Sequence, residues 1–220
     1  MLVFRWPVQP RRNRGMRDPV RLLVTVGVLF IGFGSGASLQ DTLDPRADVE
    51  AAVYGAVVRD RRLNGREFTG TQVVLQAETV DPRREWWWDT GSGTQPFDIR
   101  GRLPEADVSL VEDFARQNRT TADLGWLARR DSTLTLLSAA EFEKFFVGKD
   151  AGGWDRFYAA YPKATGIVWL SRVGLNTGGS QAILYVGRQS HYLAGAGYFI
   201  LLRKSDKGWQ IVRAELIWES

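Results

Sequence analysis

The sequence contains no cysteine and only one histidine among its 220 residues. Without cysteine the chain forms no disulfide, carries no thiolate nucleophile and offers no sulfur ligand to a metal. A metal motif that needs two imidazoles is excluded as well, and a Ser/His/Asp triad could use only His191. The composition therefore predicts neither a metal site nor a cofactor.

The surplus of positive charge belongs to the N-terminus alone. Residues 1–40 contain six arginines and one acidic residue, a net charge of +5, whereas residues 41–220 carry a net charge of −1. Nucleic-acid binding draws most of its affinity from clustered cations that neutralise phosphates. Since the part after residue 40 has no such surplus, we expect no nucleic-acid partner.

The basic N-terminus has the order of a secretory signal. Charged residues precede the apolar run Leu22–Phe33, and small residues follow at 34–38, as in the n-region, h-region and cleavage site of exported proteins. Ser35 and Ala37 would occupy the −3 and −1 positions, which predicts cleavage before Ser38.

Two alternatives concern this leader, residues 1–40. Its uncharged run continues to Gln40, roughly the length that spans a bilayer, so residues 22–40 could instead remain as a membrane anchor. Met16 would give the leader a shorter n-region, and we expect translation to begin there. In both cases the sequence predicts an exported protein, periplasmic or extracellular, that contacts a membrane only through its N-terminal segment.

Residues 41–220 are expected to form one α+β domain. Its most regular part, residues 166–220, predicts an antiparallel meander because β-branched and aromatic runs are separated by turn residues. Gly195 and Gly197, at the start of the third run, indicate a close approach of strands or a bulge. The four expected strands are residues 167–175, 181–186, 197–203 and 209–218.

The first part of this domain predicts three to four helices that pack on the sheet, with one or two further strands. Asp44 and Pro45 form a helix start, with a cap followed by proline at the first helical position. Ser138 and Glu141 match a capping box. The expected helices are residues 45–62, 103–115, 141–147 and 154–161, and the further strands are residues 71–79 and 133–137.

The one histidine lies in a predicted loop, residues 188–194. Adjacent serine and histidine side chains seldom face each other in extended backbone, so Ser190 is a poor nucleophile for His191, and no G-x-S-x-G elbow is present. We expect His191 to be a solvated loop residue, and we keep His191 and Tyr192 as candidate binding residues.

Three consecutive tryptophans, Trp86, Trp87 and Trp88, are the most unusual local feature. In an extended backbone Trp87 would face one way and its two neighbours the other. With Asp89 they could form a stacking platform for a sugar or an aromatic ligand. The alternative, which we favour, is that the indoles cover the core, because large aromatic side chains are mostly buried.

A second candidate binding patch involves Ser171 and Arg172, which interrupt an otherwise apolar strand. Arg172 would point either to solvent, which we favour, or into a polar cleft under the helices. Asn176 and Gln181 would complete this patch. Three pairs of acidic residues are interpreted as solvated surface positions rather than as the facing carboxyls of a hydrolase: Glu112/Asp113, Glu141/Glu143 and Glu215/Glu219.

Several short stretches of the meander form a recognisable pattern: residues 171–176, 181–182, 185–187, 195–197, 201–204 and 208–209. With them the meander resembles a family of uncharacterised bacterial proteins, many of them exported. The resemblance implies one fold and export, but no activity. Members of this family often carry a C-x-x-x-C pair before the third strand. The corresponding positions here are Ser190 and Ala194, which implies no redox or metal role for this loop.

These observations favour an exported, non-enzymatic domain of the bacterial cell envelope that binds an unidentified ligand or protein. No catalytic residue is predicted. One alternative is an envelope hydrolase that acts on a glycan or an ester through carboxylates, since other nucleophiles and metals are scarce. Another is a periplasmic domain tethered by the leader.

Overall fold

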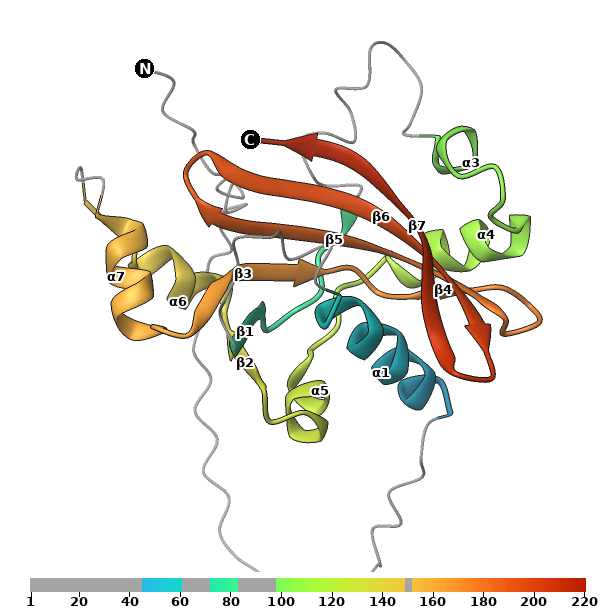
Figure 1. Ribbon diagram of the computed structural model, residues 1–220, viewed down its shortest axis with the longest axis horizontal. Coiled ribbons are helices and arrows are strands. Elements are labelled where there is room, and N and C mark those ends of the chain that lie inside the picture. Colours follow the sequence, from blue (N-terminus) through green and yellow to red (C-terminus); the bar gives the residue numbers. More distant parts are fainter. Residues whose placement is uncertain (1–44, 61–71, 83–97, 149–151) are drawn as a thin grey trace, which may run out of the picture. The chain divides into compact units, whose positions relative to one another are not determined.

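The computed structural model describes residues 45–60, 72–82, 98–148 and 152–220. These ranges belong to one compact unit, Asp44–Ser220, whereas the segment Met1–Leu43, which holds the predicted leader, lies outside them. In the described part, helices pack on a mixed seven-stranded sheet (Figure 1). The predicted α+β class is therefore confirmed.

Seven strands and six helices lie in the described residues. The strands are β1 (Gln72–Gln76), β2 (Leu134–Leu137), β3 (Ala164–Leu170), β4 (Gly174–Leu175), β5 (Gln181–His191), β6 (Ala194–Ser205) and β7 (Gly208–Glu219). The helices are α1 (Pro45–Val58), α3 (Ile99–Arg102), α4 (Val108–Gln117), α5 (Gly125–Arg130), α6 (Ala139–Lys144) and α7 (Gly153–Ala160).

The strand order in the sheet is β2-β1-β3-β5-β6-β7, and the short β4 pairs with β5. The pairs formed among β3, β4, β5, β6 and β7 are antiparallel, as the meander predicted. Strand β1 is inserted between β2 and β3 and runs parallel to both. The two further strands are thus part of the same sheet, in an orientation that the sequence pattern did not predict.

The first predicted strand of the meander is interrupted by a corner. Residues 171–173 separate β3 from β4, and side chains from other elements bind the backbone there. The Ser171 hydroxyl accepts from the amide of Tyr185 at 2.8 Å, and Arg46 donates to the carbonyl of Val173 at 2.7 Å. Because these side chains satisfy the backbone groups, the chain can leave the strand ladder without losing its hydrogen bonds.

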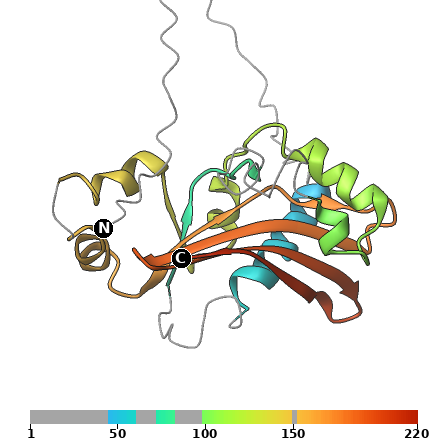
Figure 2. The same ribbon diagram turned by 90° about the horizontal axis from the view of Figure 1, so that it is seen from above.

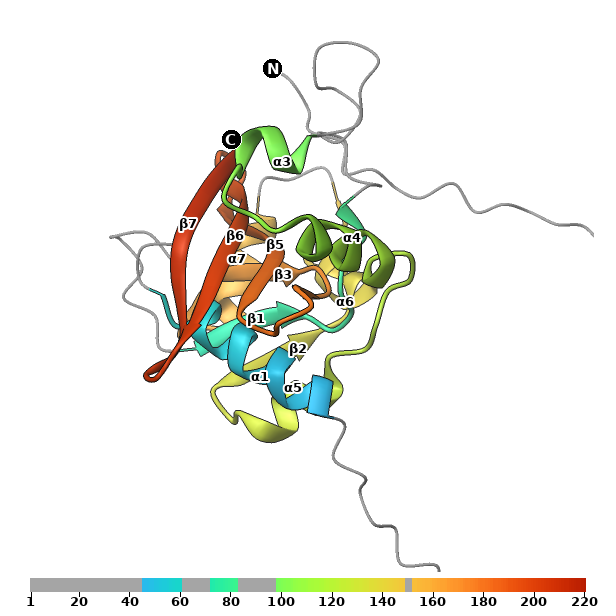
Figure 3. The ribbon, with the colours of Figure 1, turned by 90° about the vertical axis from the view of Figure 1, so that its right-hand side faces the viewer.

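Side chains of β6 alternate between two apolar layers. Ile200 and Leu202 pack in one cluster with residues of α1, while Phe199 and Leu201 pack in another with residues of α4. This alternation places α1 and α4 on opposite faces of the sheet at β6 (Figure 3). A third cluster, rich in aromatic rings, joins α6 and α7 to β3. These two helices lie at the other end of the sheet (Figure 1, Figure 2).

Several predicted helix boundaries were wrong. The first helix ends at Val58 rather than near Arg62. The helix expected from Leu103 begins only at Val108, because a turn precedes it. The Asp107 amide at the end of this turn donates to the Gln181 side chain of β5 at 3.0 Å. The short helices α3 and α5 were not predicted at all. In contrast, the Ser138–Glu141 capping box is present as expected.

Gly197 allows the close approach that its position indicated. A Cβ atom at this residue would lie 2.1 Å from Nε1 of Trp218 on β7. The indole therefore lies directly over the β6 backbone, and its Nε1–H donates to the Tyr185 hydroxyl at 2.8 Å.

Candidate functional site

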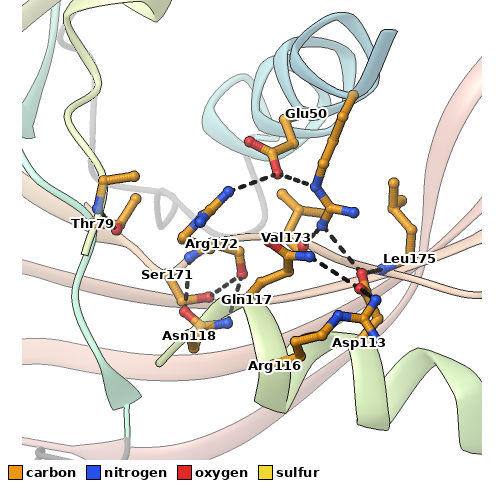
Figure 4. A network of polar contacts seen from close by, with 12 residues as sticks. Glu50, Thr79, Asp113, Arg116, Gln117, Asn118, Ser171, Arg172, Val173 and Leu175 are labelled. Carbon is orange, nitrogen blue, oxygen red and sulfur yellow. Dashed lines mark hydrogen bonds and ion pairs between the residues drawn. The ribbon is translucent and has the colours of Figure 1, made fainter. Parts of the chain in front are cut away.

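The β3–β4 corner carries a group of charged side chains that helices α1 and α4 bring together (Figure 4). We call it the corner cluster and define it as Arg46, Glu50, Asp113, Arg116 and Arg172. Glu50 and Asp113 are buried although both are carboxylates. Buried carboxylates are stable only when they are paired or hydrogen-bonded, so their partners decide what the cluster can do.

Arg46, in the first turn of α1, connects three elements. Its Nε donates to Glu50 Oε1 at 2.9 Å, and its Nη2 donates to Asp113 Oδ2 at 3.1 Å. The same Nη2 reaches the carbonyl of Val173. A single guanidinium thus holds α1, α4 and the corner together, and it neutralises charge on both buried carboxylates.

Asp113 accepts from four donors. Besides Arg46, these are the amide of Leu175 at 2.8 Å, the side chain of Gln117 at 3.1 Å and the guanidinium of Arg116. Burial alone would raise the pKa of this carboxyl, but the bonds from Leu175 and Gln117, together with Arg46, hold its pKa below the ordinary value. Asp113 is therefore an ionised structural acceptor and is poorly suited to act as a general acid.

Ser171 and Asn118 fix the backbone of the corner. The Asn118 side chain accepts from the amide of Arg172 at 2.9 Å and donates to the carbonyl of the same residue at 3.1 Å. The Ser171 hydroxyl donates to that carbonyl as well, and the hydroxyl of the buried Tyr54 donates to the Ser171 carbonyl at 3.0 Å. Burial raises the pKa of Tyr54, so this donor stays protonated. Ser171, a predicted binding residue, has a complete structural role.

Arg172 differs from the other arginines of the cluster. Its side chain is 24% exposed and turns toward α1, where Nη2 lies 3.9 Å from Glu50 Oε1 (Figure 4). Within the described residues, its Nε is excluded from solvent and has no hydrogen-bond partner. The favoured expectation of a solvated Arg172 was therefore wrong. The backbone bonds from Asn118 hold this residue at the corner, and its side chain extends toward Glu50 of α1.

The other candidates lie elsewhere. His191 is exposed at the end of β5. Within the described residues its imidazole makes only ring contacts, with centroid distances of 6.5 Å to Trp154 and 5.3 Å to Tyr192. Asn176 and Gln181 bind the 103–107 turn and the 176–181 loop rather than Arg172. Trp86, Trp87, Trp88 and Asp89 lie outside the described residues.

Not every member of the three carboxylate pairs is solvated. Asp113 is buried while its neighbour Glu112 is exposed, which corrects the surface interpretation. Glu141 caps α6, and Glu215 forms ion pairs with Arg102 and Arg213. Across the described residues, no group of three or more His, Asp or Glu side chains could hold a metal ion.

Four cluster residues were not among the candidate site residues from the sequence: Arg46, Glu50, Asp113 and Arg116. A signal for two of them was present. Asp113 sits beside Phe114 and three residues after Leu110, on the buried side of α4, and Glu50 precedes Val53 on the buried side of α1. A carboxylate within an apolar stripe indicates a buried partner. Arg46 had no such signal.

Comparison of the chain with models of protein families, with curated proteins and with solved structures gives no match. None of the helices in the described ranges is long and apolar enough to cross a bilayer. An assignment of function therefore depends on the geometry of the corner cluster.

Proposed function

We propose that this chain is an exported, non-enzymatic domain of the bacterial cell envelope that binds a ligand or partner at the corner cluster. The observation that carries the proposal is the state of Arg172. Its guanidinium is mostly buried, yet it makes no hydrogen bond within the described residues. Because the described part of the protein leaves the N–H donors of the two Nη atoms without a hydrogen bond, these donors are available to a ligand.

The carboxylates support binding over hydrolysis. A glycoside hydrolase needs one carboxyl that can carry a proton and another that stays ionised, facing each other across a substrate. Glu50 and Asp113 instead share Arg46 between them, and the pKa of Asp113 is lowered. Both carboxylates are thus occupied by the protein itself, so the hydrolase alternative finds no support at this site.

Export is supported by the order of charges and apolar residues in the leader and by the resemblance of the meander to exported bacterial proteins. Expression of the full chain in a bacterium, followed by cell fractionation and N-terminal sequencing, tests it. We expect a periplasmic or secreted protein that begins at Ser38. A membrane-bound protein that retains residues 22–40 would establish the tethered alternative, and a cytoplasmic protein that begins at Met1 would contradict export.

Binding is tested with the processed protein immobilised and exposed to detergent-solubilised envelope extract. We expect specific and saturable retention of an envelope component, which is absent on a heat-denatured sample of the same protein. The same extract is analysed for new low-molecular-mass products after incubation with soluble protein. Protein-dependent products that disappear in Glu50→Gln or Asp113→Asn would contradict a non-enzymatic role.

A further inference from the structure

The three arginines of the corner cluster differ in how their donors are used. Arg46 makes hydrogen bonds through Nε and Nη2, and Arg116 bonds to Asp113. A guanidinium has five N–H donors in a planar fork, but within the described residues Arg172 uses none of them for a hydrogen bond. Its nearest acceptor is Glu50 Oε1 at 3.9 Å, beyond hydrogen-bonding distance.

Among the described residues, the corner cluster also has one more positive than negative charge. Three guanidiniums, of Arg46, Arg116 and Arg172, face two carboxylates, of Glu50 and Asp113. Arg46 and Arg116 are the residues that bond to Asp113, and Arg46 also bonds to Glu50. Arg172, 3.9 Å from Glu50, is the least closely paired of the three guanidiniums, and the solvent-accessible part of its side chain can meet an anion.

Arg172 is held in place before any ligand arrives. Asn118 binds both the amide and the carbonyl of Arg172, and Ser171 binds the carbonyl as well. The Ser171 carbonyl in turn accepts from the buried Tyr54. Because the backbone on both sides of the side chain is fixed, little backbone freedom would be lost on binding, which favours affinity.

We infer that Arg172 binds the carboxylate group of a ligand end-on, through its two Nη atoms. This inference rests on the proposed binding function and specifies its ligand class. The Nε edge is closed to solvent, so only the Nη edge can reach a ligand, and a carboxylate matches its two parallel donors. A carboxylate carries one charge and neutralises the surplus, whereas a phosphate would bring a second negative charge close to Glu50.

The test uses the complete protein after cleavage of its leader, labelled with ¹⁵N and ¹³C, in a buffer without carboxylates. Guanidinium signals are followed by NMR during titration with acetate and with N-acetylalanylalanine, at an ionic strength held constant with chloride. The C-terminal amide of the same dipeptide is the neutral control, and inorganic phosphate is the competing class. Acetate and dipeptide together distinguish a small free acid from the C-terminus of a peptide.

We expect a saturable shift of the Arg172 signals with both carboxylates, no shift with the amide, and weaker binding of phosphate. Loss of a charge-assisted hydrogen bond in Arg172→Gln should weaken binding about ten- to a hundredfold. Arg129→Gln is the matched control, because Arg129 is an exposed arginine of α5 outside the corner cluster, and it should retain most of the affinity.

Three results would overturn the inference: shifts that grow linearly with any salt, tighter binding of phosphate than of carboxylates, or equal affinities of wild type and a folded Arg172→Gln. Retention of the same envelope component by wild type and Arg172→Gln would leave the proposed binding function intact and place it away from Arg172. If neither protein retains any component, the proposed function itself fails.

Discussion

Replacing Asp113 by asparagine should remove the charge that holds four donors at the β3–β4 corner. Asparagine keeps the size of the side chain but loses the attraction to Arg46 and Arg116, and it cannot accept from the Leu175 amide and the two guanidiniums with both of its polar atoms. The Asp113 side chain is 6% exposed, against 28% for Arg46 and 64% for Arg116. The pairs are therefore only partly desolvated.

Breaking a buried ion pair by removing one partner costs about 3–5 kcal/mol. Because the two arginines retain contact with water, the free energy of unfolding should fall by about 3 kcal/mol, at the lower end of that range. Urea denaturation at neutral pH measures this, with an unchanged dependence on urea as evidence that the folded state is intact. Glu112→Gln, at the exposed neighbouring position on α4, should change stability by less than about 0.5 kcal/mol. A loss below about 1 kcal/mol in Asp113→Asn would refute the structural role of the cluster.

The remaining predictions concern pH, a glycine contact and a buried hydroxyl. The folded-state pKa of Asp113 lies below its unfolded value. The stability that the ionised Asp113 gives the fold is therefore complete above the unfolded pKa and is lost as the pH falls through the folded pKa. The difference in stability between wild type and Asp113→Asn should accordingly shrink in acid, and a constant difference down to about pH 2 would contradict a depressed pKa. Gly197→Ala should displace Trp218, whose Nε1 would lie 2.1 Å from the new methyl group, and should lower the free energy of unfolding by about 1–3 kcal/mol. Gly178→Ala, where the nearest atom is 3.8 Å away, serves as its control in the same urea denaturation, and equal effects would contradict the contact. Tyr54→Phe should cost about 1–3 kcal/mol, because the buried carbonyl of Ser171 loses its donor; a thermal unfolding temperature equal to that of wild type would contradict this bond.

Features set by neighbouring residues could be read from the sequence. The Ser138–Glu141 capping box depends on residues three apart, and both of its hydrogen bonds are present. The turn between the expected strands 197–203 and 209–218 depends on Gly208, which adopts a positive φ of 96°. The β6–β7 hairpin follows from such a local signal. The β5–β6 hairpin does not: β5 continues to His191 and β6 begins at Ala194, so the prediction of a loop over residues 188–194 was wrong.

Features set by distant residues could not be read in the same way. Strand β1 pairs in parallel with both β2 and β3, and a strand of five residues carries no signal for the orientation of its partners. The direction of Arg172 depends on Asn118, 54 positions away. Asp113 was assigned to the surface as a member of the acidic pair Glu112/Asp113, although its spacing from Leu110 places it on the buried side of α4.

The most direct test of the corner cluster as a binding site is the ratio of two dissociation constants. Calorimetry with N-acetylalanylalanine gives Kd for wild type and for Arg172→Gln under identical salt, after circular dichroism has shown that both are folded. A Kd that rises about tenfold or more in Arg172→Gln, with little change in Arg129→Gln, is the expected result. Equal Kd values for wild type and Arg172→Gln would contradict the assignment of Arg172 as the anion-binding residue.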